Sequence, residues 1–138
     1  MLYDNHGRQI SYVRLAVTDR CNLRCFYCMP EEGIHFAPKH EILRFEEMER
    51  LLRVLADLGV NKVRLTGGEP FVRRDLMLFL EKIAAIPGIE KIALTTNGTL
   101  VAPYVKHFKR LKINSVNLSL DSLDPERFFT VTHREKPL

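Results

Sequence analysis

The sequence predicts an α/β fold in which parallel strands alternate with crossover helices around an open or barrel-like sheet. Four short β-branched and aliphatic segments are separated by stretches with apolar residues at three- and four-residue spacing. Each unusual motif of the chain follows one of these four segments. With 138 residues, 46% of them hydrophobic, the chain suits one domain covering residues 1–138.

The four predicted strands comprise residues 12–18, 62–66, 91–96 and 115–120. Apolar stripes predict a first helix over residues 48–58, closed by Gly59, and a second over residues 76–83. A third helix is expected over residues 103–111, and Asp124 with the proline after it is typical of the start of a fourth. The chain therefore contains four β-α units.

Alternation along the strands gives the sheet two unlike faces. One face is apolar and is expected to meet the helices. The other carries Arg14, Lys62, Arg64, Thr95, Asn117 and Ser119. This second face is too polar for a packed barrel interior, so it predicts a lumen filled by a ligand. Its cations favour an anion, phosphate groups in particular. An open sheet with one solvated face is the alternative.

Three cysteines, Cys21, Cys25 and Cys28, lie within eight residues and are the only ones in the chain. Three thiolates can hold a four-iron cluster on three irons and leave the fourth iron open to a substrate. A zinc site completed by His35 or His40 is the alternative. The odd count and the absence of an apolar leader argue against disulfides, so we expect a reducing, cytoplasmic location.

Three further motifs follow the later strands. Gly67-Gly68 follows the second strand, Asn97-Gly98 the third, and residues 119–121 close the fourth. Because the carboxyl ends of parallel strands meet at one edge of a sheet, these motifs and the cysteines are expected to converge there. The glycine pair would let the backbone approach a charged ligand end, such as an amino-acid head group.

The charge pattern excludes other classes of partner. The net charge of +4 is modest, and the only dense basic run, residues 107–112, is better explained as a solvated helix face than as a nucleic-acid patch. No segment approaches the roughly 18 apolar residues of a membrane span.

Together the motifs resemble a known family. Cys-x3-Cys-x2-Cys with Tyr27 before the last cysteine, followed by Gly-Gly-Glu-Pro, resembles the radical S-adenosylmethionine (SAM) superfamily. The fuller stretches, residues 13–30, 64–70, 94–98 and 116–121, resemble the GTP 3',8-cyclase family of molybdenum cofactor biosynthesis.

This resemblance implies a partial (β/α)6 TIM-type barrel, of which the chain supplies the first four β-α units. It implies a 4Fe-4S cluster on the three cysteines, whose open iron chelates S-adenosylmethionine. Reductive cleavage then gives a 5'-deoxyadenosyl radical that takes hydrogen from the ribose C3' of GTP, and the resulting carbon radical attacks C8 of guanine.

Residue by residue, the resemblance implies S-adenosylmethionine contacts at Tyr27, Gly68 and Ser119. It implies GTP contacts at Arg14, Arg64 and Thr95, with Lys62 and Asn97 as second choices. It also implies a reductant for the cluster, and it leaves a homodimer open.

The chain also departs from the family. Members are more than twice as long and carry three further cysteines, which hold a second cluster. We therefore expect this chain to be an N-terminal fragment that is weakly active or inactive alone. Arg44 stands where a serine or threonine cap is usual. A radical SAM enzyme with another substrate and a non-catalytic, zinc-binding or truncated module are the alternative functions.

Overall fold

The computed structural model describes residues 1–30 and 32–134, so the last four residues of the expected domain lie outside the description. The strands are β1 (Tyr12–Ala16), β2 (Lys62–Thr66), β3 (Lys91–Thr96) and β4 (Ile113–Leu118). The helices are α1 (Phe45–Asp57), α2 (Leu76–Ala84), α3 (Pro125–Thr132) and the 3-10 helices η1 (Pro70–Val72) and η2 (Ala102–His107). No helix among the described residues is long and apolar enough to cross a membrane.

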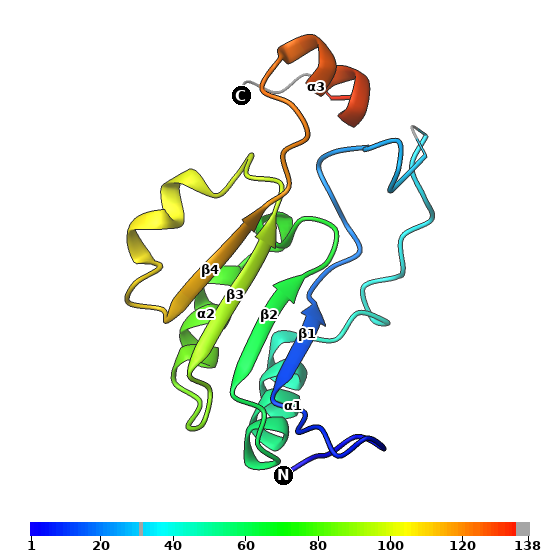
Figure 1. Cartoon of the computed structure of the whole chain (residues 1–138). Helices are drawn as coiled ribbons and strands as arrows, with labels where there is room; N and C mark the ends of the chain where they lie inside the picture. Colours follow the sequence, from blue (N-terminus) through cyan, green and yellow to red (C-terminus); the bar gives the residue numbers. More distant parts are fainter. Residues whose placement is uncertain (31, 135–138) are drawn as a thin grey trace.

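The four strands form one parallel sheet in the order β1-β2-β3-β4, as the β-α repeat predicts. Helices α1 and α2 lie against the same face of the sheet, and α3 lies beyond the carboxyl ends of the strands (Figure 1). Phe45 of α1 and Phe79 of α2 stack with ring centroids 4.3 Å apart, which joins the two helices over the core.

The predicted alternation is confirmed in β1 and β2 and only partly in β3, where Ala93 on the opposite face is buried as well. Their apolar side chains Leu15, Val63, Leu65, Ile92 and Leu94 are all buried under the helices. The fourth strand differs, because no helix among the described residues buries Val116 and Leu118, which are 39% and 55% exposed. The helix expected over residues 103–111 is the 3-10 helix η2, none of whose residues is buried.

Two strand boundaries also differ from the prediction. β1 ends at Ala16, two residues early, and β4 covers Ile113–Leu118 in place of residues 115–120. Residues 119–121 therefore follow the fourth strand, although the Ser119 N-H still donates to the Thr96 carbonyl at 2.9 Å. An irregularity in register between Ile92 and Ala93 accompanies the shift.

Both helix-end predictions are confirmed. Gly59 follows α1 with φ of +101°, the left-handed region expected after a helix C-terminus. Asp124 precedes α3, and its side chain accepts a hydrogen bond from the Arg127 N-H at 2.9 Å. At the start of α1, Arg44 supplies no accepting side chain, but Glu47 accepts from the Arg44 N-H at 2.7 Å.

Candidate functional site

The motifs converge on one cavity at the carboxyl edge of the sheet. Its volume is about 200 Å³. Its lining includes the three cysteines and the predicted ligand contacts Tyr27, Gly68, Thr95, Asn97 and Ser119. The structure thus brings together residues almost 100 positions apart in the chain. Arg14, Lys62 and Arg64 do not line this cavity.

Helix α3 contacts the loop after β1 that carries the three cysteines, which we call the cysteine loop. The Arg24 N-H donates to the Thr132 carbonyl at 2.8 Å, and the Phe26 N-H donates to the Val131 carbonyl at 3.0 Å. These carbonyls belong to the last turn of α3, where helical partners are missing. The end of the helix and the loop therefore satisfy each other's backbone groups.

The segment with Gly67 and Gly68 contacts the chain just before the first cysteine through backbone hydrogen bonds. The Gly68 N-H donates to the Thr18 carbonyl and the Glu69 N-H to the Arg20 carbonyl, both at 2.8 Å. A Cβ on Gly68 would overlap the carbonyl of Arg20, and one on Gly67 would overlap that of Thr18. The glycines are therefore needed for close approach to the cysteine loop, a use that the sequence reading of them did not include.

Glu69 joins the loop ends of two strands. It is 1% exposed, and its carboxylate accepts from Thr96 Oγ1 at 2.8 Å, from the Asn97 N-H at 2.7 Å and from the Phe71 N-H at 3.1 Å. A buried carboxylate needs such partners to offset its desolvation. This role is not predicted from the sequence, because only its place in a strand-end motif marks Glu69.

The network continues from Asn97 to the cysteines. Asn97 Nδ2 lies 2.9 Å from Asn22 Oδ1 and 3.8 Å from Cys21 Sγ. Asn22 in turn donates to Thr99 Oγ1 at 2.8 Å. One chain of hydrogen bonds thus runs from Glu69 to the first cysteine.

Tyr27 and Asp121 close another side of the cavity. The Tyr27 hydroxyl donates to Asp121 Oδ2 at 2.8 Å, and this hydrogen bond to a carboxylate raises the pKa of Tyr27. Burial raises the pKa of the Cys25 thiol. Asp121 was expected only as the end of a motif, so its pairing with Tyr27 is an addition.

The three cysteines that line the cavity are a donor set that can hold an iron-sulfur cluster. No three Cys, His, Asp or Glu side chains within residues 1–30 and 32–134 lie close enough to hold one metal ion. Ligands of one ion must meet at a point, whereas a cluster takes each thiolate on a different iron. His35 and His40, the zinc alternative, are both exposed and do not line the cavity.

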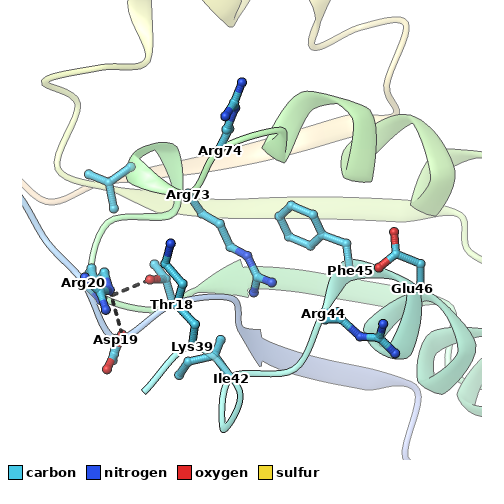
Figure 2. Close-up of a pocket in the computed structure, with 11 residues that line it drawn as sticks. Thr18, Asp19, Arg20, Lys39, Ile42, Arg44, Phe45, Glu46, Arg73 and Arg74 are labelled. Carbon is cyan, nitrogen blue, oxygen red and sulfur yellow. Dashed lines mark hydrogen bonds and ion pairs between the residues drawn. The ribbon is translucent and has the colours of Figure 1, made fainter. Parts of the chain in front are cut away.

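A second pocket is lined by Thr18, Asp19 and Arg20, which precede the first cysteine, and by residues at the start of α1 (Figure 2). It has a volume of about 450 Å³ and contains none of the predicted ligand contacts. Within it, the Arg73 guanidinium donates to the Val17 carbonyl and, at 2.7 Å, to the Leu43 carbonyl, and it lies 4.0 Å from the ring centroid of Phe45. Arg73 therefore links the residue that follows β1 to the segment that precedes α1.

Below the first cavity, the sheet face turned away from α1 and α2 is cationic. We call it the polar face; its residues include Tyr12, Arg14, Lys62, Arg64, Lys91 and Thr95. Arg14 pairs in register with Arg64, and Lys62 with Lys91. Like charges on directly opposed residues destabilise a sheet, and none of the four strands contains an Asp or Glu to offset them.

Arg64 connects this face to the cavity. Its Nη1 lies 3.3 Å from Thr95 Oγ1, and Thr95 lines the cavity. Two of the predicted GTP contacts therefore meet, and Arg14 lies beside Arg64 on the neighbouring strand. Lys91 is a cation of this face that the sequence analysis did not single out.

Comparison with known proteins gives a family match. Residues 15–137 match the model of the Radical SAM superfamily. The chain is 52% identical over 133 residues to the GTP 3',8-cyclase of Syntrophomonas wolfei, covering 96% of this chain and 41% of that protein. It is 49% identical over 131 residues to the GTP 3',8-cyclase of Heliobacterium modesticaldum, covering 95% of this chain and 40% of that protein.

The fold has solved counterparts. SuiB of Streptococcus suis superimposes with a TM-score of 0.65 at 26% identity, over 89% of this chain and 27% of that one. The chain spans about two-fifths of the length of the curated relatives it matches.

Proposed function

We propose, on the premise that this chain belongs to the radical SAM superfamily, that its cavity binds a 4Fe-4S cluster and S-adenosylmethionine and that its polar face binds GTP for 3',8-cyclisation. One observation carries the proposal. The cavity that gathers the three cysteines opens beside a face with two in-register pairs of like charges and no carboxylate in its strands.

Cys21, Cys25 and Cys28 would hold the cluster. A bound 4Fe-4S cluster supplies the electron that cleaves S-adenosylmethionine reductively. The side chains and backbone of the chain would position S-adenosylmethionine beside the cluster. Gly68, Ser119 and Tyr27 line the space next to the thiols, and Asp121 fixes the Tyr27 hydroxyl.

The polar face would orient GTP. A triphosphate carries several negative charges, and the guanidinium groups of Arg14 and Arg64 can each make paired hydrogen bonds to phosphate oxygens. Binding would relieve the repulsion between the in-register cations. Thr95 lies between this face and the cavity, so a nucleotide anchored by its phosphates would reach toward the cysteines.

The relatives support the nucleotide assignment. Both relatives described above are GTP 3',8-cyclases, at 52% and 49% identity. Because the chain spans about two-fifths of their length, we propose that it carries the S-adenosylmethionine-cleaving part of the reaction.

The test has two stages. The chain is reconstituted anaerobically with iron and sulfide, and the reduced protein is examined by electron paramagnetic resonance with and without S-adenosylmethionine. We expect a four-iron signal that shifts on adding S-adenosylmethionine. A chain that takes up zinc stoichiometrically and forms no cluster would overturn the assignment.

The second stage measures GTP binding by calorimetry. Binding of S-adenosylmethionine without binding of GTP would favour a radical SAM enzyme with another substrate.

A further inference from the structure

Tyr12 contacts two cations of the polar face. Its hydroxyl oxygen accepts a hydrogen bond from Arg64 Nε at 2.9 Å. Its ring lies under the Lys62 ammonium, with Nζ 5.0 Å from the ring centroid, which is within the range of a cation-π contact. No motif in the sequence marks Tyr12.

The contact with Tyr12 completes the fixation of Arg64. Nη1 of Arg64 lies 3.3 Å from both the Leu94 carbonyl oxygen and Thr95 Oγ1. With Nε on Tyr12, two of the three guanidinium nitrogens are held by the protein. Nη2 makes no hydrogen bond within residues 1–30 and 32–134, so its donors are left for a ligand.

Holding a long side chain in advance strengthens binding. An arginine that is free in solution loses rotamer entropy when a ligand immobilises it, and that loss is subtracted from the affinity. A hydroxyl acceptor holds the guanidinium without neutralising it, whereas a carboxylate in the same place would compete with an anionic ligand.

We infer that Tyr12 is a positioning residue for a polyphosphate ligand, acting through Arg64. The inference rests on the proposed function, because it takes the polar face to be the GTP site. It goes further by assigning part of the affinity to a residue that is not expected to touch the ligand itself. Tyr12 is 40% exposed on the edge strand β1. Removing its hydroxyl should therefore leave no buried polar group without a hydrogen-bond partner.

The test uses Tyr12→Phe, which keeps the ring over Lys62 and removes only the hydroxyl. Binding of GTP and of inorganic tripolyphosphate to the whole chain is measured by calorimetry at low ionic strength. We expect both to bind about fivefold more weakly to the variant, the change that corresponds to one hydrogen bond of about 1 kcal/mol. Tyr3→Phe, an exposed tyrosine outside the polar face, is the matched control and should bind as the original chain does.

A double-mutant cycle separates positioning from a general effect. Arg64→Lys has no nitrogen at the Nε position, so adding Tyr12→Phe to it should change the affinity no further. If Tyr12→Phe weakens binding equally in both backgrounds, the hydroxyl does not act through Arg64 and the inference is wrong.

The remaining outcomes separate this inference from the function on which it rests. Equal affinity of Tyr12→Phe and the original chain overturns the positioning role and leaves the GTP site standing. Failure of the original chain to bind either probe overturns both.

Discussion

Glu69 and Asn97 are joined by a hydrogen bond of 2.7 Å from the Asn97 backbone N-H to Glu69 Oε2. The bond links the loop after β2 to the loop after β3. Through the Asn97 side chain it also reaches Asn22 and Cys21 in the cysteine loop. The spacing of the strand ends, and with it the shape of the cavity, therefore depends on a buried carboxylate.

Replacing Glu69 should destabilise the fold. Glu69→Ala leaves two backbone N-H groups and the buried Thr96 hydroxyl without their acceptor, and we expect a loss of about 3 kcal/mol in the free energy of unfolding. Urea denaturation followed by circular dichroism measures it. Glu32→Gln, a change at an exposed glutamate, is the control. A loss below about 0.5 kcal/mol, the usual range for surface changes, would contradict the prediction.

Gly68 should tolerate no side chain, for a steric reason. A Cβ there would overlap the Arg20 carbonyl, so Gly68→Ala must push the cysteine loop away, at a cost of about 3 kcal/mol. Gly7→Ala is a useful comparison, because Gly7 has φ of +74° and open space around its Cβ position. That variant should lose only about 1 kcal/mol, from backbone strain.

Thermal unfolding of the two glycine variants distinguishes these costs. We also expect Gly68→Ala to take up less iron than Gly7→Ala under the same anaerobic reconstitution. Equal stability and equal iron content in the two variants would show that the loop yields to a methyl group without consequence.

The sequence predicts the first three strands well, for a physical reason. In β1 and β2 the alternating side chains are sorted by burial under α1 and α2, so periodicity and structure agree. In β3, Ile92 and Leu94 are buried as predicted, but Ala93 on the opposite face is buried too. β4 has the same pattern, but no helix within residues 1–30 and 32–134 covers it, so Val116 and Leu118 are exposed. The register irregularity beside Ile92 depends on pairing between strands, which periodicity within one strand cannot reveal.

Partners across the sheet also explain what the sequence analysis missed at the site. The cysteines and the strand-end motifs could be placed because a parallel sheet brings its carboxyl ends to one edge. The role of Glu69 depends on donors 27 and 28 residues away, and Lys91 matters because it lies in register with Lys62. Neither relationship is visible along the chain.

A substitution at the N-cap of α1 should stabilise the chain. Arg44 occupies the N-cap without an accepting side chain, while Glu47 already accepts from its backbone N-H. Arg44→Ser should add the missing acceptor and complete a capping box, stabilising the chain by about 1 kcal/mol in urea denaturation. Arg44→Ala, which removes the same charge without supplying an acceptor, should not stabilise it.

The free energy of unfolding should fall in acid, partly because Glu47 at the start of α1 becomes protonated. The hydrogen bond from the Arg44 backbone lowers the pKa of Glu47, and that from the Arg8 backbone lowers the pKa of Asp4. A carboxyl whose pKa is lower when folded contributes stability above its unfolded pKa and loses it as pH falls through the folded pKa. We therefore expect the urea concentration at the unfolding midpoint to decrease once the pH falls below about 4.5, which is near the pKa of an unfolded Glu.

Glu47→Gln tests that assignment. The variant should be less stable than the original chain at pH 7, and the gap should narrow as the pH falls toward 3. A gap that stays constant over this range would mean that ionisation of Glu47 makes no contribution.

Reversing the charge of Lys91 tests the polar face as an anion site. Lys91 is exposed and lies in register with Lys62, so Lys91→Glu places a carboxylate beside the cations proposed to bind phosphate. We expect GTP to bind about tenfold more weakly, an effect of about 1.4 kcal/mol that should shrink as salt screens the charges. Calorimetry at two ionic strengths measures it.

Lys109→Glu is the matched control, because it makes the same change in net charge at an exposed lysine outside the four strands. If both variants weaken GTP binding to the same extent, the attraction comes from the overall charge of the chain. A loss confined to Lys91→Glu would instead mean that the ligand lies against the rows of cations that β1, β2 and β3 hold in register.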